Sequence, residues 1–306
     1  MLQIDTDLFE QEQKPILLDS GCRRSHTTTM RYQAVQRAIL TMQERYMGPL
    51  TLSEIADAAQ LSPFHFDRVF RSMIGVSPSV FIAAIRMKEA QKLLLQTNRS
   101  VTSICFDVGY TSLGTFTSRF TQLVGLPPSR FRQVAQEQFM QTRPLDLQHL
   151  LSELPAHHAG NSDQGISGSI HTTRPFAGLI FVGLFSHPLP QGQPAGCCIL
   201  TSPGRYAIAP VPDGEYYLFC AAVSHTQDFF SVLHQGPYLH GGKDTVPLVV
   251  HQGRATVEKM IVLTRPSWAD PPVVVAFPWL FLQQLQHVSH LAVPAGEAVL
   301  AGQQRA

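Results

Sequence analysis

The chain has few cysteines, no long hydrophobic run and none of the common catalytic motifs. Its five cysteines are odd in number and show no CxxC spacing, which argues against a disulfide framework or a zinc knuckle. The longest apolar run, Pro271–Leu282, contains an internal proline and is too short to span a bilayer. The acidic start lacks the basic and apolar parts of a signal peptide. We therefore expect a soluble, cytoplasmic protein with no membrane partner.

The missing motifs also bear on catalysis and metal binding. The sequence holds no GxSxG, HExxH, P-loop or GxGxxG motif, so we predict no enzymatic activity, no catalytic residue and no cofactor. We expect no metal site, because the histidines lack ligand spacing such as HxxxH. The histidines considered are His157, His158, His225, His234, His240 and His251. The adjacent Cys197 and Cys198 are interpreted as a buried strand pair rather than a redox sensor.

Charge is divided unevenly along the chain, although the net charge is only +1. Between Arg31 and Ala135 there are 12 Lys and Arg residues against 6 Asp and Glu, and the rest of the chain holds 11 against 16. A basic part joined to an acidic part indicates that the first meets a polyanion. The hydrophobic fraction of 44% supports real buried cores.

The apolar pattern divides the chain into a helical part and a β part. We expect a flexible arm over 1–29, a helical domain over 30–138, a linker over 139–165, a β-sandwich over 166–282 and a flexible tail over 283–306. The predicted fold class is multidomain: an all-α domain of about seven helices is followed by an all-β sandwich.

Start and stop signals accompany the helical spacing. Gly48-Pro49 ends the first helix, and a capping box of Thr51 and Glu54 opens the second. The apolar stripe of the first helix consists of Val35, Ala38, Ile39 and Met42. A longer helix is predicted over the stretch "SVFIAAIRMKEAQKLLLQTN".

The helical part repeats itself at an offset of 49 to 50 residues. "LSEIADAAQLSPFHFDRVFRSMIGVSPSVF" is echoed by "VTSICFDVGYTSLGTFTSRFTQLVGLPPSRF". The matching pairs include Ile55 and Ile104, Phe66 and Phe116, Phe70 and Phe120, Gly75 and Gly125, and Phe81 and Phe131. Each unit reads as a short helix, a tight turn and a second helix ended by glycine, which is the helix-turn-helix plan.

The two units, with the long helix "MKEAQKLLLQTN" between them and "RFTQLVGLPPSRFR" at the end, resemble the DNA-binding domain of the AraC/XylS family. The resemblance covers about 100 residues, with units at 52–75 and 101–125. It implies a sequence-specific transcription regulator whose two reading helices enter adjacent major-groove faces of double-stranded DNA. The family usually carries this domain at its C-terminus, whereas here it lies near the N-terminus.

The first reading helix divides by phase, at about 100° per residue. Phe66, Val69, Phe70 and Met73 are predicted as core. The outward face is predicted to contact DNA, because Arg pairs with guanine edges and Phe can touch a thymine methyl. Its residues are Phe64, Arg68 and Arg71, flanked by His65, Asp67 and Ser72.

The second reading helix has a less basic outward face. Its predicted DNA-facing residues are Gly114, Ser118 and Thr121, flanked by Thr115 and Thr117. We therefore predict that the first unit supplies most of the direct base discrimination.

Phosphate contacts are expected beside both reading helices. Ser62, Thr111 and Ser112 are predicted to cap the helix starts, where hydroxyls and backbone N–H groups can meet phosphates. The arginines predicted to contact phosphates are Arg86, Arg130 and Arg132.

The β part resembles the carboxypeptidase-regulatory, transthyretin-like β-sandwich through "GRYAIAPVPDGEYYL". "PDG" is predicted as a tight turn between two alternating strands, one with Tyr206 and Ile208 and one with Tyr216 and Leu218. A further strand is predicted over "PVVVAFP". Such a module would bind a small-molecule or protein effector.

Two alternatives come from other classes. A DNA-repair methyltransferase can carry an AraC-like domain, but none of the five cysteines lies in a "PCHR"-like setting. The other is a β-sandwich that binds a ligand or peptide, with an accessory helical domain.

Overall fold

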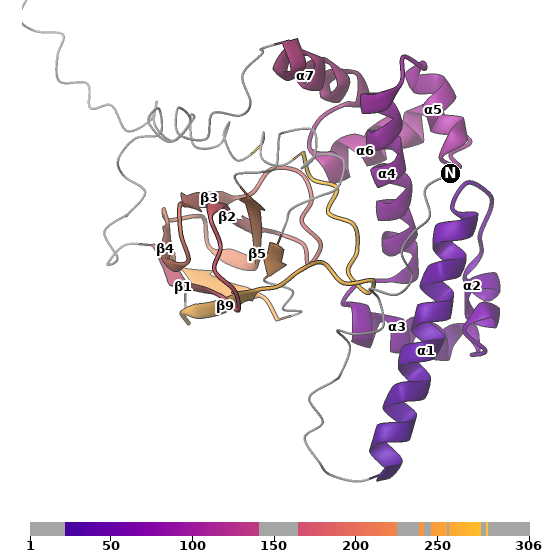
Figure 1. The fold of residues 1–306 in the computed structure, drawn as a ribbon, viewed down its shortest axis with the longest axis horizontal. Coiled ribbons are helices and arrows are strands. Elements are labelled where there is room, and N and C mark those ends of the chain that lie inside the picture. The colour runs from indigo at the N-terminus through magenta and orange to yellow at the C-terminus, as the bar shows by residue number, and fades with distance from the viewer. Residues whose placement is uncertain are drawn as a thin grey trace, which may run out of the picture.

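The computed structural model describes residues 22–140, 165–224, 239–241, 246–255, 257–276 and 280. Helices form the first part of the chain and strands the second, and the two parts lie side by side (Figure 1). Among the described residues, no single helix has both the length and the apolar content to cross a bilayer; the bent pair Pro63–Ile74 and Pro78–Gln96 passes that test together.

Seven helices are present in the described residues, as the sequence predicts. They are α1 (Cys22–Arg45), α2 (Leu52–Ala58), α3 (Pro63–Ile74), α4 (Pro78–Gln96), α5 (Val101–Asp107), α6 (Leu113–Val124) and α7 (Pro128–Met140). The first of them, α1, begins at Cys22, within the stretch 1–29 that the sequence analysis expects to be an arm. Once a helix is nucleated it can extend over polar residues, which carry no apolar stripe for the sequence pattern to detect.

The predicted capping box opens α2. The Thr51 hydroxyl accepts a hydrogen bond from the Glu54 backbone N–H, and the Glu54 carboxylate accepts one from the Thr51 N–H at 2.8 Å. Arg45 also donates to Glu54 at 2.9 Å. The bonds from Thr51, followed by that from Arg45, lower the pKa of Glu54 to about 2. This carboxyl is therefore tied into the start of the first helix-turn-helix unit.

The repeat in the sequence is a repeat in space. Three aromatic rings stack in each unit, with centroids 5.4 Å apart between Phe66 and Phe70 and 5.7 Å apart between Phe116 and Phe120. In each unit the second ring meets a third from the following helix, edge to face. The third rings belong to Phe81 and Phe131. Each unit thus has its own buried aromatic core.

The turns repeat as well. Gln60 and Gly109, at matching positions, have φ values of 58° and 84°. Both turns need a left-handed residue, and only the second uses the glycine that adopts this conformation without strain. The helices that follow end at Gly75 and Gly125, with φ values of 84° and 90°.

The strands form two sheets in the described residues. They are β1 (Ile166–Thr172), β2 (Gly178–Phe185), β3 (Gly196–Leu200), β4 (Gly204–Ile208), β5 (Gly214–Ser224), β6 (Leu239–Gly241), β7 (Leu248–His251), β8 (Arg254–Ala255) and β9 (Lys259–Leu263). One sheet has the order β4-β1-β9, with β1 antiparallel to β4 and parallel to β9. The other has the order β3-β2-β5-β7-β8, with β6 paired to β5.

The larger sheet is buried on both sides at strand β2. Every residue of β2 is buried, and alternate residues face opposite layers. Leu179 and Phe181 pack with the helices, whereas Ile180 and Val182 pack with the smaller sheet. A continuous apolar run is what a strand covered on both faces requires. The helices, the larger sheet and the smaller sheet therefore form three layers.

The "PDG" stretch does not make the predicted turn within one sheet. Strands β4 and β5 pair with β1 and β2, in different sheets, so the connection carries the chain from one sheet to the other. Tyr206 and Tyr216 nevertheless belong to the same buried cluster. Alternation placed each tyrosine on one face of its strand, but it does not distinguish a neighbour in the same sheet from one across the core.

The stretch "PVVVAFP" is not the predicted strand in its described part. Residues 271–276 have no ladder partner and run along the helices instead (Figure 1). The Ala276 N–H donates to the Val124 carbonyl at 2.9 Å, and the Gln91 amide donates to the Val274 carbonyl at 2.6 Å. Upstream, the Trp268 indole N–H donates to the Tyr32 hydroxyl of α1 at 2.6 Å. We call residues 268–276 the return segment, because it brings the chain back to the helices.

Candidate nucleic-acid interface

Helix α3 presents two different faces. Phe66, Val69 and Phe70 are buried as predicted. Ser62 takes the extended N-cap conformation and Pro63 occupies the first helical turn, where the missing N–H of proline costs nothing. The same helix therefore anchors itself in the core and leaves its other face to solvent.

The outward face of α3 carries an exposed ring and two exposed cations. The Phe64 side chain is 92% exposed, and Arg68 and Arg71 are exposed. Arg71 Nε donates to Asp67 Oδ2 at 2.8 Å, and Arg68 Nη2 lies 3.2 Å from His65 Nδ1. The two contacts orient the guanidinium groups along the helix before any ligand arrives.

Helix α6 presents small hydroxyl residues instead. Gly114, Thr115 and Ser118 are exposed, whereas Thr117 and Thr121 are half-buried. Thr121 Oγ1 donates to the Thr117 carbonyl at 2.8 Å. The two outward faces therefore differ in charge, in the sense that the sequence predicts.

Two residues that were not predicted to face DNA also lie at or beside the outward surface of α6. Leu113, the first residue of α6, is exposed, although its helical phase suggests a core position. Its place in the first turn of the helix is the sequence signal that could have indicated exposure. Arg119 is half-buried and donates to Gln122 Oε1 at 2.9 Å.

The helix starts differ in their caps. The Ser112 hydroxyl accepts the Thr115 N–H and so caps α6 as predicted. The predicted cap by Ser62 is wrong, because its hydroxyl makes no capping hydrogen bond in α3. Thr111 is exposed and lies one residue before the N-cap. Pro63 has no N–H, and the remaining first-turn N–H groups of α3 lie at the surface end of the helix.

Two of the three arginines predicted to contact phosphates, Arg86 and Arg132, bind backbone carbonyls of the protein itself. Arg86 donates to the carbonyls of Tyr46 and Gly48 at 2.8 and 2.9 Å. Arg132 donates to the carbonyls of Leu94 and Arg99 at 3.1 and 2.7 Å. Both fix the ends of preceding helices, and these donors are directed at the backbone rather than at solvent.

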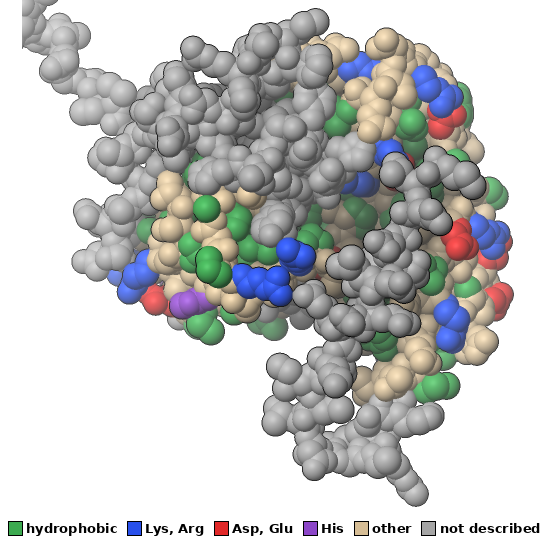
Figure 2. All heavy atoms as spheres, viewed as in Figure 1, with side chains coloured by type: hydrophobic (Ala, Val, Ile, Leu, Met, Phe, Trp, Pro, Cys, Tyr) green, Lys and Arg blue, Asp and Glu red, His purple; other side chains and the backbone are tan. Residues whose placement is uncertain are grey.

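Arg130 Nη1 lies 3.5 Å from Glu137 Oε1, and both side chains are exposed. Further ion pairs of the helical part join Arg45 with Glu54, Lys92 with Glu89 and Arg99 with Asp107. On the face in Figure 2, basic and acidic side chains lie close together over the helices. The positive charge of this part is thus partly balanced by neighbouring carboxylates, and on α3 the Asp67 carboxylate pairs with Arg71.

Met73 corrects the predicted core of α3. Its phase matches Phe66, but it is 37% exposed. Met73 lies in the last turn of α3, where it borders a cavity.

The described residues contain no group of three or more His, Cys, Asp and Glu that could hold a metal ion. His251 is exposed and its Nδ1 lies 3.1 Å from Asp213 Oδ2. His157, His158, His225 and His234 lie outside the described residues.

Cys197 and Cys198 lie on β3, where burial raises the pKa of each thiol to about 12.

Residues 55–134 match the family model described as a helix-turn-helix domain. The match takes in both left-handed turns and both reading helices. These residues form a helix-turn-helix domain.

Two curated relatives that are similar to this part of the chain are named as transcription regulators. The bifunctional transcriptional activator/DNA repair enzyme AdaA of Bacillus subtilis is 33% identical over 92 residues, which are 30% of this chain and 44% of the relative. The HTH-type transcriptional regulator ExsA of Pseudomonas aeruginosa is 32% identical over 99 residues, 32% of this chain and 36% of the relative. The chain thus spans less than half the length of these curated relatives.

Among solved structures, an AraC-type transcriptional regulator from Chromobacterium violaceum is 25% identical and has a TM-score of 0.33. The match covers 34% of this chain and 93% of that one.

Proposed function

We propose that the protein is a sequence-specific regulator of transcription whose AraC-type domain binds double-stranded DNA. The observation that carries the proposal is the doubled helix with one aromatic, buried face and one polar, exposed face. Proteins of this plan place the second helix of each unit in the major groove. Two units in one chain would read two successive groove faces, so one copy could occupy an asymmetric site.

The first unit reads bases and the second fits the groove. Arg68 and Arg71 each have the planar donors that pair with guanine O6 and N7, and Phe64 can contact a thymine methyl. His65 and Asp67 orient these arginines. On α6 the base-facing residues are Gly114, Thr115, Thr117, Ser118 and Thr121, whose small side chains permit a close approach.

Phosphate contacts surround both helices. Ser62 and Thr111 supply exposed hydroxyls, Ser112 caps α6, and the helix starts favour anions through their dipoles. Arg130 is the proposed peripheral phosphate contact. Arg86 and Arg132 act chiefly by fixing the helix ends that set the two units.

A DNA-binding series tests the proposal. A duplex enriched from a random pool by the full chain is titrated at several salt concentrations, because phosphate contacts make affinity salt-dependent. Arg68→Ala and Arg71→Ala should each relax base preference, at a cost of about 1–3 kcal/mol. Ser118→Ala and Thr121→Ala should change preference less.

Arg205→Ala is the matched control, since it removes an exposed arginine that pairs with Glu258 in the β part. Sequence-indifferent binding that all five variants leave unchanged would overturn the proposal.

We further propose that the β part is a sandwich of the transthyretin-like type and acts as an effector or interaction domain over 166–282. Its support is the buried cluster shared by the two sheets. The boundaries at 30–138 and 139–165 are proposed in the same way.

The repair-enzyme alternative has less support. Burial raises the pKa of the thiol of Cys105, Cys197, Cys198 and Cys220, which disfavours the reactive thiolate. The match to AdaA covers only the helix-turn-helix part.

A further inference from the structure

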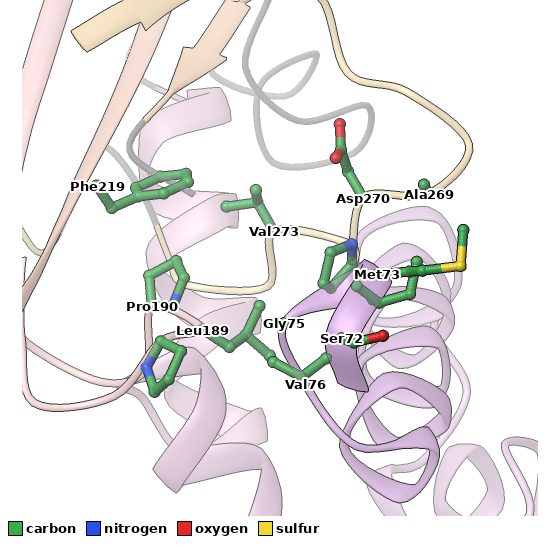
Figure 3. Close-up of a pocket in the computed structure, with 13 residues that line it drawn as sticks. Ser72, Met73, Gly75, Val76, Leu189, Pro190, Phe219, Ala269, Asp270 and Val273 are labelled. Carbon is green, nitrogen blue, oxygen red and sulfur yellow. The ribbon is translucent and has the colours of Figure 1, made fainter. Parts of the chain in front are cut away.

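A cavity of about 300 Å³ lies where the first helix-turn-helix unit meets the β part. Three stretches far apart in the sequence surround it: the end of α3 with the turn to α4, the loop after β2, and the return segment (Figure 3). The ring of Phe219 on β5 lies on the side of the sheet. Ligand sites favour such junctions between structural units.

The side chains that line the cavity are mainly apolar, and polar atoms supply nearly half of its surface. Its principal lining residues are Met73, Val76, Leu189, Pro190, Phe219 and Val273. Its volume is about twice the roughly 150 Å³ of an apolar cavity that holds benzene. Asp270 and Ser72 add polar atoms; Asp270 Oδ2 accepts the Ser267 N–H at 2.6 Å, and Ser72 Oγ donates to the Val69 carbonyl at 2.8 Å. A carboxylate among the lining residues disfavours an anion, so the chemistry suits a neutral aromatic or alicyclic molecule.

The two units are attached to the β part in different ways. Helices α4 to α7 share one continuous buried cluster with β2, β3 and β5. The first unit has a separate cluster, which Trp268 of the return segment joins from its edge. Beside that contact, the first unit faces the cavity. The second unit is thus packed solidly against the β part, whereas the first meets it partly across a hollow.

The cavity also adjoins the candidate DNA-reading helix. Ser72, Met73 and Ile74 are the last residues of α3, and Gly75 is its left-handed cap. The outward arginine Arg71 directly precedes them. A molecule in the cavity would contact the end of α3 and the β part at once, and would favour one placement of α3 relative to α6.

We propose that this cavity is a binding site for a neutral, mainly apolar small molecule, and that its occupancy changes DNA affinity. The proposal rests on the proposed DNA-binding function. A ligand that binds one arrangement of the two reading helices more tightly than another shifts the population toward it, and the coupling is reciprocal.

The test uses the full chain and indole as the probe. Calorimetry should show one saturable site, and Val273→Phe, which fills the cavity, should weaken binding by about tenfold. Met73→Ala changes an exposed wall residue and serves as a second variant if Val273→Phe does not fold; it too should weaken indole binding. Val249→Phe adds the same ring at an exposed position of β7 and should change nothing.

DNA affinity is then measured with and without indole on a duplex enriched by the full chain. We expect a shift in wild type and in Val249→Phe, and none in Val273→Phe. Equal indole binding by all variants, no saturable binding, or a DNA affinity that indole leaves unchanged would overturn the proposal. A chain that enriches no duplex at all would instead overturn the proposed function.

Discussion

The side-chain amide of Gln91 in α4 donates a 2.6 Å hydrogen bond to the carbonyl of Val274, across 183 residues of sequence. Gln91 is 1% exposed, and Val274 is buried in the cluster that joins helices to sheet. A buried amide that meets the return segment is thus part of the attachment between the two parts.

Removing this amide should weaken the whole chain. Gln91→Leu leaves the Val274 carbonyl without this donor, and an unsatisfied buried polar group costs about 1–3 kcal/mol. Equilibrium denaturation should show that loss, while Gln133→Leu at an exposed position of α7 should be nearly neutral. Equal stabilities of the two variants would mean that the hydrogen bond contributes little.

The two matching turns should differ in their sensitivity to substitution. At Gly109 an added Cβ would lie 2.7 Å from the carbonyl oxygens of Tyr46 and Met47, and its φ of 84° is unfavourable for alanine. Gly109→Ala should therefore destabilise by more than the ~1–2 kcal/mol of left-handed strain alone.

Gln60→Gly relieves that strain but adds backbone entropy in the unfolded chain, so its effect should stay within ~1 kcal/mol of wild type. Thermal unfolding of both variants decides the comparison. A Gly109→Ala protein as stable as Gln60→Gly would contradict the role assigned to the turn.

The capping box should give the stability a pH dependence. The pKa of Glu54 is lowered from 4.5 to about 2 in the folded chain, so its contribution is present above about pH 4.5. It is lost as the pH falls toward 2, because the unfolded chain binds the proton first. In Glu54→Gln this part of the dependence should disappear from denaturation curves taken across that range. Glu44→Gln at an exposed position of α1 should retain it.

Asp67 should restrain the DNA affinity of the first unit. Its ion pair with Arg71 occupies the Nε–H donor of that arginine. The carboxylate also places a negative charge beside the face proposed to enter the groove. Asp67→Asn should raise affinity for unrelated duplexes and narrow the difference between sequences. If the released Arg71 contacts a phosphate, the salt slope should steepen by about 0.9. Fluorescence anisotropy at several salt concentrations measures both, and an unchanged slope with unchanged affinity would contradict this role.

The sequence predicted the helical part well because its signals are local. The phenylalanine repeat, the Thr51–Glu54 capping box and the glycine helix ends each specify a conformation within a few residues. The positions of Phe64, Arg68 and Arg71 followed from helical phase alone.

The misplaced residues depend on distant neighbours. Met73 has the right phase, but it borders a cavity and stays partly exposed. Val274 is apolar and extended like a strand residue, yet its backbone partner is a side chain of α4. Arg86 has the charge of a phosphate ligand, and only the fold shows that two backbone carbonyls of the turn after α1 accept hydrogen bonds from it. The local sequence pattern does not indicate contacts with residues that are far away in the sequence.

Burial of β2 on both faces has a consequence for dissecting the molecule. Leu179 and Phe181 would be stripped of their helical cover in a fragment that starts at 165, and α4 to α7 would lose the matching surface in a fragment that ends at 140. Each piece alone would present a broad apolar surface and tend to self-associate. Produced together, the two pieces should reassemble without a peptide bond between them, as the halves of one split protein.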